Sequence, residues 1–452
     1  MMYSEEIIAL EKRVESRVPK GKIYQLPTDL EHVWDGLEDI GLGPRWLSVV
    51  RKPEMHVELG GPKWGYKSFF FTELIDDSSR VVDGRVTVIG PEVHEMTKGD
   101  SMPIALNIRF WGNDLNLMHN EYVERQVVLG LYGVEGLMTF GPPDHVWIRM
   151  NQSVADRLSL QKISQIVHAM LKTNIPMLEK VESRWVVGST QGERLDLIEG
   201  LREVYLRKKE VIEVQTAYED EDVEMFYGCT LCKTLAPNHV CVITPETIPY
   251  CGIISYSGAI VTNEIDPMGY TFEIPKGEIL DAAAGHFKGV DQLVYEKSNH
   301  VVKEVQLYTT MKNTTTNCGC FEAASFYIPD VNGIGLVNRR YSGETPIGIK
   351  FSTMAGMISG GTQVDGFKGL SVRGMKSKKF LIGDGGWFRI VWMPKDLKIE
   401  LADAIPEEVY DKIATDGDCI EPGELRKFLA EKKHPIVEKF WRNGTPVPVD
   451  LF

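Results

Sequence analysis

The first 228 residues of this 452-residue chain contain no cysteine, and the whole chain contains seven. A secreted disulfide scaffold is short and has cysteines spread along its length, so this distribution excludes that class. The chain also has no run of about 18 uncharged apolar residues, and we therefore expect no transmembrane helix. Met1–Val14 has the apolar spacing of an amphipathic helix without the uninterrupted apolar core of a signal peptide, which predicts a cytoplasmic protein.

Basic residues are outnumbered by acidic ones, with 50 Lys and Arg against 64 Asp and Glu and a net charge of −14. An acidic surface repels the phosphates of nucleic acids and of anionic lipids, so we expect no nucleic-acid or membrane partner. The remaining composition is that of a globular protein, with 43% hydrophobic residues to build cores. The length fits two or three domains.

The first two hundred residues alternate between strand and helix patterns. We predict strands over 85–89 and 104–110, and helices over 116–137, 153–173 and 196–211. Ser153 is expected to cap the second of these helices. The alternation predicts an α/β domain over residues 26–201, preceded by an N-terminal helix or extension over residues 1–25.

The second half has a different texture, and we place the domain boundary near residue 202, before a solvated acidic run at Glu219–Glu224. Beyond it, short apolar stretches are separated by many glycines and prolines. They predict strands over 240–242, 253–256 and 380–382, with helices only near the end, over 407–414 and 422–431. We therefore expect an α+β domain over residues 202–452, with the cysteines on its loops.

Four of the cysteines form a first group, namely Cys229, Cys232, Cys241 and Cys251. A continuous helix through this group is excluded by Pro237, Pro245 and Pro249. Four thiolates on loops suit either a tetrahedral zinc ion or a [4Fe–4S] cluster. Zinc ribbons usually have two Cys-x2-Cys pairs and this segment has one, but the pattern leaves both possibilities open.

A second group is Cys318–Gly319–Cys320. Two cysteines on either side of one residue fit the geometry of a disulfide poorly, but they can bind one metal ion from the same side. Glycine lets the backbone fold closely over that ion, and the peptide nitrogens become ligands once deprotonated. Two sulfurs and two nitrogens in a plane select Ni(II) or Cu(II) over tetrahedral zinc. Taken alone, the pattern is also compatible with two buried cysteines.

Taken together, these cysteines resemble the A-cluster motif of acetyl-CoA synthases in number, order and spacing. The motif reads Cys229-Thr-Leu-Cys232-Lys-Thr-Leu-Ala-Pro-Asn-His239-Val-Cys241, followed by Cys251 and by Cys318-Gly319-Cys320. The resemblance extends from about residue 25 to the C-terminus and includes Val57-Glu-Leu-Gly-Gly-Pro-Lys63. The length is similar to that of the archaeal β subunit of the acetyl-CoA decarbonylase/synthase complex, or of a short form of the bacterial α subunit without its N-terminal docking domain.

The resemblance implies a set of metal ligands. A [4Fe–4S] cluster would be held by Cys229, Cys232, Cys241 and Cys251. Cys232 would also bridge to a proximal nickel, and Cys318 and Cys320 would connect that nickel to a distal one. The backbone nitrogens of Gly319 and Cys320 would complete the distal site. The proximal nickel would have open positions, and copper or zinc can replace it in isolated protein.

The resemblance also implies an activity, that of a CO-methylating acetyl-CoA synthase, an acyltransferase of the Wood–Ljungdahl pathway of anaerobic carbon fixation. A methyl group from a methyl-corrinoid iron–sulfur protein and CO from carbon monoxide dehydrogenase subunits would combine into an acetyl-nickel species. Coenzyme A would then release acetyl-CoA, and the reverse steps would cleave it. Because the metal performs the bond chemistry, we expect no side chain to act as a general acid or base.

Several residues near the motif are candidates for supporting roles. Leu235 stands where many family members have a phenylalanine thought to shield the proximal nickel. His239 is either a hydrogen-bond donor to a cluster sulfur or a packed loop histidine. Two glycine-rich stretches, 358–361 and 383–386, lack a phosphate-binding pattern and are expected to be turns. Cys419 is expected to be a lone structural thiol.

Coenzyme A carries phosphates and an adenine, which arginines and aromatic faces recognise. The candidates in the first domain are Trp147, Arg149, Arg157, Arg184, Trp185 and Arg194. For each single arginine, a solvated surface position is the alternative.

Overall fold

The computed structural model describes residues 3–38, 40, 50–138, 144–189, 191–215, 218–249, 254–419, 421–449 and 451. The chain divides into two compact units, residues 1–217 and 218–452. The predicted boundary at residue 202 falls inside helix α5 (Glu193–Gln215). Leu201, Val204 and Tyr205 of this helix are buried in the core of the first unit, so the boundary lies later, next to the acidic run.

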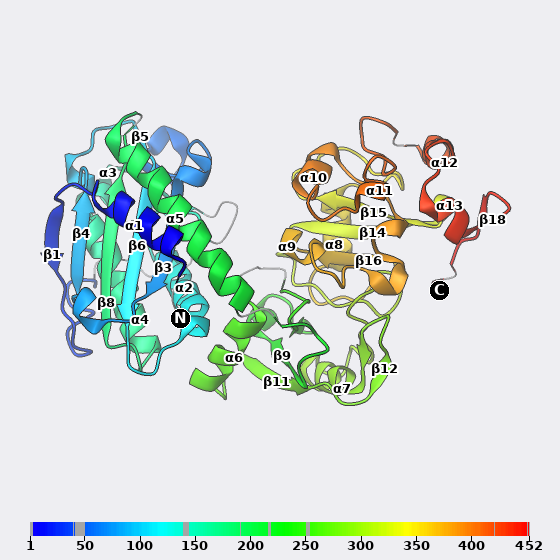
Figure 1. Ribbon diagram of the computed structural model, residues 1–452, viewed down its shortest axis with the longest axis horizontal. Helices are drawn as coiled ribbons and strands as arrows, with labels where there is room; N and C mark the ends of the chain where they lie inside the picture. The colour runs from blue at the N-terminus through cyan, green and yellow to red at the C-terminus, as the bar shows by residue number, and fades with distance from the viewer. Residues whose placement is uncertain are drawn as a thin grey trace. The chain divides into compact units, whose positions relative to one another are not determined.

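The first unit contains a three-layer α/β structure (Figure 1). Its mixed sheet has the order β1 (Lys22–Gln25), β4 (Arg85–Ile89), β8 (Lys180–Val187), β6 (Ile104–Trp111) and β3 (Ser68–Leu74). Helices α1 (Glu5–Glu15) and α5 share a core with one face of this sheet. Helix α4 (Leu160–Asn174) packs on β4 and β8. The strands predicted over 85–89 and 104–110 and the N-terminal helix are confirmed.

The rest of the first unit is a smaller sheet and two further helices. The sheet has the order β5 (Asp100–Met102), β2 (Val57–Gly60) and β7 (Trp147–Met150), and the helices are α2 (Leu117–Tyr132) and α3 (Gln152–Arg157). The helix predicted over 153–173 is in fact α3 followed by α4. Ser153 does not cap it, because the side chains of Asn151 and Ser159 accept the first-turn hydrogen bonds of the two helices.

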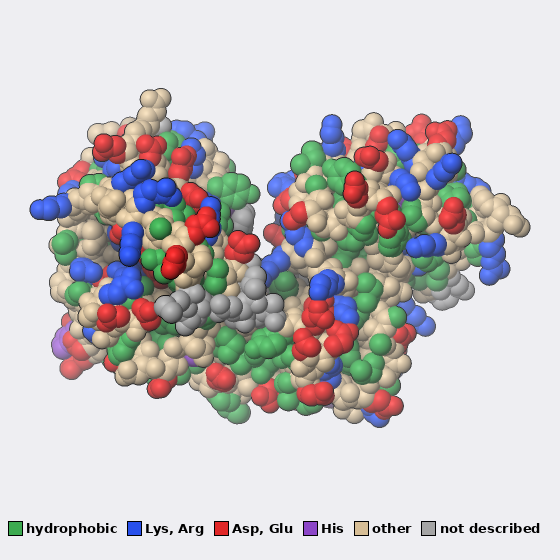
Figure 2. All heavy atoms as spheres, viewed as in Figure 1, with side chains coloured by type: hydrophobic (Ala, Val, Ile, Leu, Met, Phe, Trp, Pro, Cys, Tyr) green, Lys and Arg blue, Asp and Glu red, His purple; other side chains and the backbone are tan. Residues whose placement is uncertain are grey.

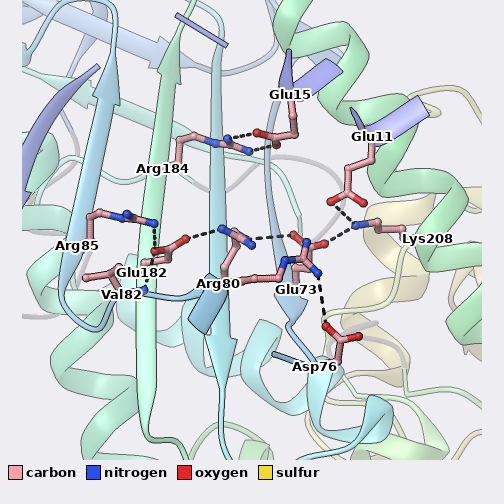
Figure 3. A network of polar contacts seen from close by, with 11 residues as sticks. Glu11, Glu15, Glu73, Asp76, Arg80, Val82, Arg85, Glu182, Arg184 and Lys208 are labelled. Carbon is pink, nitrogen blue, oxygen red and sulfur yellow. Dashed lines mark hydrogen bonds and ion pairs between the residues drawn. The ribbon is translucent and has the colours of Figure 1, made fainter. Parts of the chain in front are cut away.

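Charged side chains form a network on the sheet face beneath α1 and α5 (Figure 3). Glu182, with 7% of its side chain exposed, accepts hydrogen bonds from Arg85 and Arg109, each at 2.6 Å. Lys208 of α5 pairs with Glu73 on β3 and with Glu11 on α1. Charges of opposite sign therefore alternate across the sheet and connect it to both helices.

The second unit begins with a three-stranded antiparallel sheet, ordered β10 (Cys241–Ile243), β9 (Met225–Cys229) and β11 (Thr271–Pro275). Helix α7 (Lys288–Lys297) packs on one face through a core that includes Phe226 and Val242. Helix α6 (Tyr256–Ile265) packs on the other face, against Tyr227 and Ile243. A hairpin of β12 (Ile279–Asp281) and β13 (His286–Phe287) follows α6 and β11 in the chain.

A second, four-stranded sheet has the order β16 (Phe367–Leu370), β14 (Ala323–Ile328), β15 (Gly333–Asn338) and β17 (Ile390–Trp392). One of its faces shares a core with α8 (Phe351–Ile358), α12 (Pro422–Glu431) and α13 (Pro435–Lys439). The other face shares a core with α9 (Val372–Met375), α10 (Lys395–Glu400) and α11 (Glu407–Tyr410). A short hairpin, β18 (Trp441–Arg442) and β19 (Thr445–Pro446), lies near the C-terminus. The unit is thus mixed α/β with several small sheets.

Three expectations for this unit are wrong. Helices are not confined to its end, since α6 to α10 precede the predicted ones. The strand predicted over 253–256 overlaps the start of α6, whose N-terminus is capped by the Ser255 side chain. The strand predicted over 380–382 is a turn, because Leu381 has a left-handed backbone with φ of 48° and begins a 3-10 helix, Ile382–Asp384.

On the face shown in Figure 2, acidic and basic side chains are interspersed on each unit. In the second unit, Lys376 pairs with Asp403 at 2.7 Å, and Lys378 pairs with Glu219 of the acidic run at 2.6 Å. The acidic run is therefore partly neutralised by lysines of the same unit. Among the residues that the structure describes, no helix is both long and apolar enough to cross a membrane.

Candidate metal centre

Cys229 and Cys241 lie at the ends of paired strands rather than on loops. Cys229 is the last residue of β9 and Cys241 the first of β10, and the two are directly opposite in the antiparallel register. Directly opposed residues project from the same face of a sheet, with Cβ atoms about 5 Å apart. The sheet therefore presents these two thiols side by side.

Cys232 follows on a 3-10 turn, Leu231–Thr234. Its carbonyl oxygen accepts hydrogen bonds from the backbone N–H groups of Leu235 and Ala236, at 3.0 and 2.9 Å. This turn reverses the chain immediately after β9. Cys251, the fourth predicted ligand of this group, lies outside the described residues.

The paired thiols of the second group are close together. The Sγ atoms of Cys318 and Cys320 are 2.7 Å apart, farther than the roughly 2.05 Å of a disulfide bond. With metal–sulfur bonds of about 2.3 Å, a tetrahedral ion separates two sulfurs by about 3.8 Å, and a square-planar ion holds neighbouring sulfurs about 3.3 Å apart. The observed spacing is shorter than both values, so the two thiols are close enough to contact one ion from the same side. Gly319 between them has φ of +116°, a conformation that side-chain-bearing residues rarely adopt.

The two cysteine groups, far apart in the sequence, meet in space. Hydrogen bonds from Cys232 first, and then from Cys320, hold the pKa of the Cys318 thiol well below its usual range, although burial opposes them. The backbone N–H of Cys320 also donates to Cys318. Sulfur atoms from both groups therefore lie together, with the Cys320 amide nitrogen directed at Cys318, and such sulfur and nitrogen donors suit a soft metal ion.

His239 connects the first group to the segment that precedes the second. Only 1% of the residue is exposed. Its Nε2 lies 3.0 Å from Cys241 Sγ, and its Nδ1 lies 3.0 Å from the Thr316 hydroxyl oxygen. This contact favours the hydrogen-bonding interpretation of His239.

Two further residues position the site and were not identified from the sequence. Arg339 donates from Nη2 to the carbonyl oxygens of Gly319 and Phe321, at 2.7 and 2.9 Å. Gly361, with φ of +84°, donates its N–H to the Asn317 carbonyl at 2.8 Å and packs against the backbone of the loop that carries His239. The glycine-rich stretch 358–361 was a signal for Gly361, whereas no local pattern marks Arg339.

Leu235 lies on the surface of the second unit, with 84% of the residue exposed, and Leu231 beside it is 47% exposed. Leu235 therefore presents an apolar side chain to its surroundings, three residues beyond Cys232. The shielding role expected for this position remains a prediction.

Trp147 and Arg149 form a cluster around Glu58 in the first unit. The Trp147 indole donates to Glu58 at 3.1 Å, and the Arg149 guanidinium donates twice, at 3.1 and 2.9 Å. Burial tends to raise the pKa of Glu58, but these hydrogen bonds together hold that pKa below its usual value. The structure brings these two coenzyme A candidates together, with the arginine already paired.

The other coenzyme A candidates have hydrogen-bond partners other than Glu58. Arg157 pairs with Glu135 at 2.8 Å, Arg184 pairs with Glu15, and Arg194 donates to the Val187 carbonyl at 2.9 Å. Trp185 is fully buried, and its indole donates to Ser164 at 2.7 Å. In this structure Trp185 is a core residue with no face available to a ligand, because strand alternation directs it away from Arg184.

Two family models match consecutive parts of the chain. The model described as "CO dehydrogenase/acetyl-CoA synthase complex beta subunit" matches residues 44–191. The model for the C-terminal part of the "ACS/CODH beta subunit" matches residues 208–439. The solved C-terminal domain of an acetyl-coenzyme A synthase alpha subunit matches 26% of this chain and 95% of its own, at 42% identity and a TM-score of 0.25.

Curated relatives cover most of the chain. "Acetyl-CoA decarbonylase/synthase complex subunit beta 2" of Methanocaldococcus jannaschii is 45% identical over 86% of this chain and 81% of its own length. "Acetyl-CoA decarbonylase/synthase complex subunit beta" of Methanothermobacter thermautotrophicus is 38% identical over 86% of this chain and 83% of its own. The chain therefore belongs to the family of CO dehydrogenase/acetyl-CoA synthase complex beta subunits.

Proposed function

We propose that this chain synthesises and cleaves acetyl-CoA at a nickel–nickel–[4Fe–4S] cluster held by its second unit. The observation that most supports this is the 2.7 Å approach of the Cys318 and Cys320 sulfurs around a left-handed Gly319, with Cys232 hydrogen-bonded to Cys318. A single zinc site needs no such pair beside a separate thiol group. The names of the relatives, which refer to acetyl-CoA decarbonylase/synthase complexes, agree with this activity.

The cluster would be bound as the family resemblance implies. The [4Fe–4S] ligands would be Cys229, Cys232, Cys241 and Cys251. Cys232, Cys318 and Cys320 would hold the proximal nickel, and Cys318, Gly319 and Cys320 the distal nickel, with copper or zinc as competitors for the proximal position. Soft thiolates and peptide nitrogens suit these metals. Two of the cluster ligands, Cys229 and Cys241, are held in fixed positions because they are paired across strands β9 and β10.

When bound, this cluster supplies the chemistry that joins a methyl group, CO and the coenzyme A sulfur. The chain itself holds and orients the donors. His239 Nε2 lies 3.0 Å from Cys241 Sγ, where it would donate a hydrogen bond to the cluster thiolate, hold that sulfur in place and offset part of its negative charge. Gly319 provides the tight backbone turn between the paired thiols. Exposed Leu235 gives an apolar border beside Cys232, where water would be displaced by a docking partner.

The partners of the activity follow from its substrates. We propose carbon monoxide dehydrogenase subunits as the source of CO, and a methyl-corrinoid iron–sulfur protein as the methyl donor. We propose a coenzyme A site in the first unit at Trp147 and Arg149, whose indole and guanidinium lie on adjacent positions around Glu58. The location would be the cytoplasm, and the class of enzyme a CO-methylating acyltransferase.

Metal analysis of anaerobically reconstituted protein tests the proposal. We expect about two nickels and about four irons per chain. Iron alone would indicate an electron-transfer protein, and one zinc a structural site; either result contradicts the proposal. In Gly319→Val we expect nickel to be lost and iron retained, because a β-branched residue rarely adopts φ of +116°. The added side chain itself meets little resistance, since Ser359 Cβ, the nearest described atom to the new Cβ position, is 3.4 Å away.

Gly99→Val is the matched control. Gly99 has φ of +97°, and no described residue lies within 4 Å of the position that a Cβ atom would take there. It belongs to the first unit, whereas the paired thiols belong to the second. The substitution imposes a similar backbone strain without touching the site. Equal loss of nickel in both variants would show that strain alone, rather than the geometry of the paired thiols, decides metal content.

A further inference from the structure

Arg339 clamps the backbone of the paired-thiol segment from outside the motif. It follows strand β15, and its Nη2 donates to Gly319 O at 2.7 Å and to Phe321 O at 2.9 Å. Its own backbone N–H donates to Glu322 O at 2.9 Å, and its guanidinium carbon lies 5.7 Å from the centre of the Phe351 ring. These contacts fix the guanidinium against the segment 319–322.

The first of these contacts involves the oxygen that responds to metal binding. Gly319 O belongs to the same peptide group as the Cys320 nitrogen. When a metal ion replaces the proton on that nitrogen, the proton leaves to solvent, and the negative charge is shared with the oxygen of the same peptide. Two thiolates and two such nitrogens carry four negative charges against the two positive charges of a Ni(II) ion. The site therefore has an excess of negative charge, part of it on the atom that Arg339 contacts.

We propose that Arg339 is a positioning residue that compensates this charge and so determines how tightly the paired-thiol site holds nickel. The inference rests on the proposed metal centre and adds a residue to it. A charge-assisted hydrogen bond from a guanidinium to an anionic oxygen is stronger than one to a neutral carbonyl. Arg339 consequently binds the metal-loaded peptide more strongly than the metal-free one, and this difference favours loading.

Charge and shape can be separated by substitution. Arg339→Met keeps an unbranched side chain but removes the charge and the donors, while Arg339→Lys keeps the charge with a different donor geometry. The neighbouring Arg340 supplies the matched control, because it pairs with Glu400 and lies 3.6 Å from Asp396, on α10. Arg340→Met removes an equal charge one residue away without touching the carbonyls of the thiol segment.

The experiment measures nickel binding and geometry, not activity. Each full-length protein is reconstituted anaerobically, its iron and nickel contents are determined, and its nickel affinity is measured by competition with a chelator. Nickel X-ray absorption reports the number of nitrogen and sulfur ligands. We expect Arg339→Met to retain iron and to bind nickel at the paired thiols about 10- to 100-fold more weakly. Arg339→Lys should recover a large part of the affinity, and Arg340→Met should match the wild type.

Each other outcome has a defined meaning. If Arg339→Met binds nickel as tightly as wild type, the inference is overturned while the proposed function stands. If Arg339→Lys is as weak as Arg339→Met, charge compensation is overturned. If the wild-type protein binds no nickel with mixed nitrogen and sulfur ligands, the proposed metal centre fails, and the role of Arg339 fails with it.

Discussion

His239 places its Nε2 atom 3.0 Å from the Sγ atom of Cys241, two residues further along the chain. The opposite ring nitrogen lies 3.0 Å from the hydroxyl of Thr316, in the segment that leads to the paired thiols. One buried imidazole therefore joins the two segments that supply the proposed ligands. Its orientation is held from both ends.

Replacing His239 by phenylalanine should weaken the iron–sulfur cluster and lower its reduction potential. Hydrogen bonds to cluster sulfurs stabilise the more negative, reduced state, so their loss makes reduction harder. Loss of such an outer hydrogen bond typically costs about 10- to 100-fold in metal affinity. Iron content and a potentiometric titration followed by electron paramagnetic resonance check both effects. An unchanged potential would contradict the hydrogen bond. Thr316→Val removes the contact on the other side of the ring and a weak hydrogen bond from the Val240 N–H, but leaves the contact with Cys241, so it should have a smaller effect.

Gly361→Ala should destabilise the second unit and displace the loop that carries His239. A Cβ atom at Gly361 would lie 2.7 Å from the His239 backbone nitrogen and 2.9 Å from the Asn238 carbonyl carbon. Adjacent Gly360 has a similar φ, +75° against +84°, but no described residue lies within 4 Å of the position that its Cβ atom would take. Gly360→Ala should therefore lower the free energy of unfolding through backbone strain alone, by about 1 kcal/mol. Gly361→Ala should lower it by about 1–3 kcal/mol more, because the added methyl group also meets the neighbouring backbone.

Urea denaturation and iron content are measured for both variants. The expected order of stability is wild type, then Gly360→Ala, then Gly361→Ala, with iron lost mainly from the last. Equal stability of the two variants would mean that the loop yields to the added methyl group without cost.

The network on the first sheet gives a prediction about stability (Figure 3). Glu182→Gln should cost about 1–3 kcal/mol, because Arg85 and Arg109 lose their shared buried carboxylate, while Arg109 keeps Glu73 at 3.7 Å. Asp76→Asn, at the rim of the same network, should cost about 0–1 kcal/mol, since Asp76 is 82% exposed and 3.4 Å from Arg80. Urea unfolding followed by tryptophan fluorescence measures both. A cost for Glu182→Gln no larger than that for Asp76→Asn would contradict a buried role for this carboxylate.

Elements with a complete local signal were predictable from the sequence. Helix α12 has the predicted bounds 422–431, and Pro422 stands at its first position, where proline favours helix initiation. Strand β4 has the predicted bounds 85–89, and burial alternates over its first four residues. The apolar residues around Tyr256 failed as a signal, because a short apolar run does not distinguish a buried strand from a buried helix.

At the candidate site, the sequence predicted which cysteines belong together, but not the residues that support them. The order and spacing of the cysteines led to the metal hypothesis, and the contact of Cys232 with Cys318 agrees with a shared centre. Arg339 reaches that centre only through tertiary structure, so nothing in its local sequence distinguishes it from Arg340. Trp185 was misjudged for a reason visible in the sequence: in a strand, Arg184 and Trp185 must point to opposite faces.

The buried His434 should make the second unit sensitive to mild acid. The residue is 0% exposed; its Nδ1 accepts the backbone N–H of Ile436 at 3.1 Å, and its Nε2 lies 3.0 Å from the Ile390 carbonyl oxygen. These contacts select the neutral ring with its proton on Nε2. Burial, with a smaller contribution from Lys412, lowers the pKa of His434 from 6.5 to about 4.

Below pH 6.5 the unfolded chain binds a proton at this position that the folded chain takes up only near pH 4. The contribution of neutral His434 to the free energy of unfolding is therefore complete above pH 6.5 and is lost as the pH falls toward 4, by about 3 kcal/mol in total.

His434→Asn retains a side-chain acceptor for the Ile436 N–H but does not titrate. Urea unfolding between pH 7 and 4 should show a shallower loss of stability in this variant. His168, whose pKa is also lowered to about 4, lies in the first unit and is present in both proteins, so the difference between the two curves isolates His434. Parallel curves would contradict the prediction.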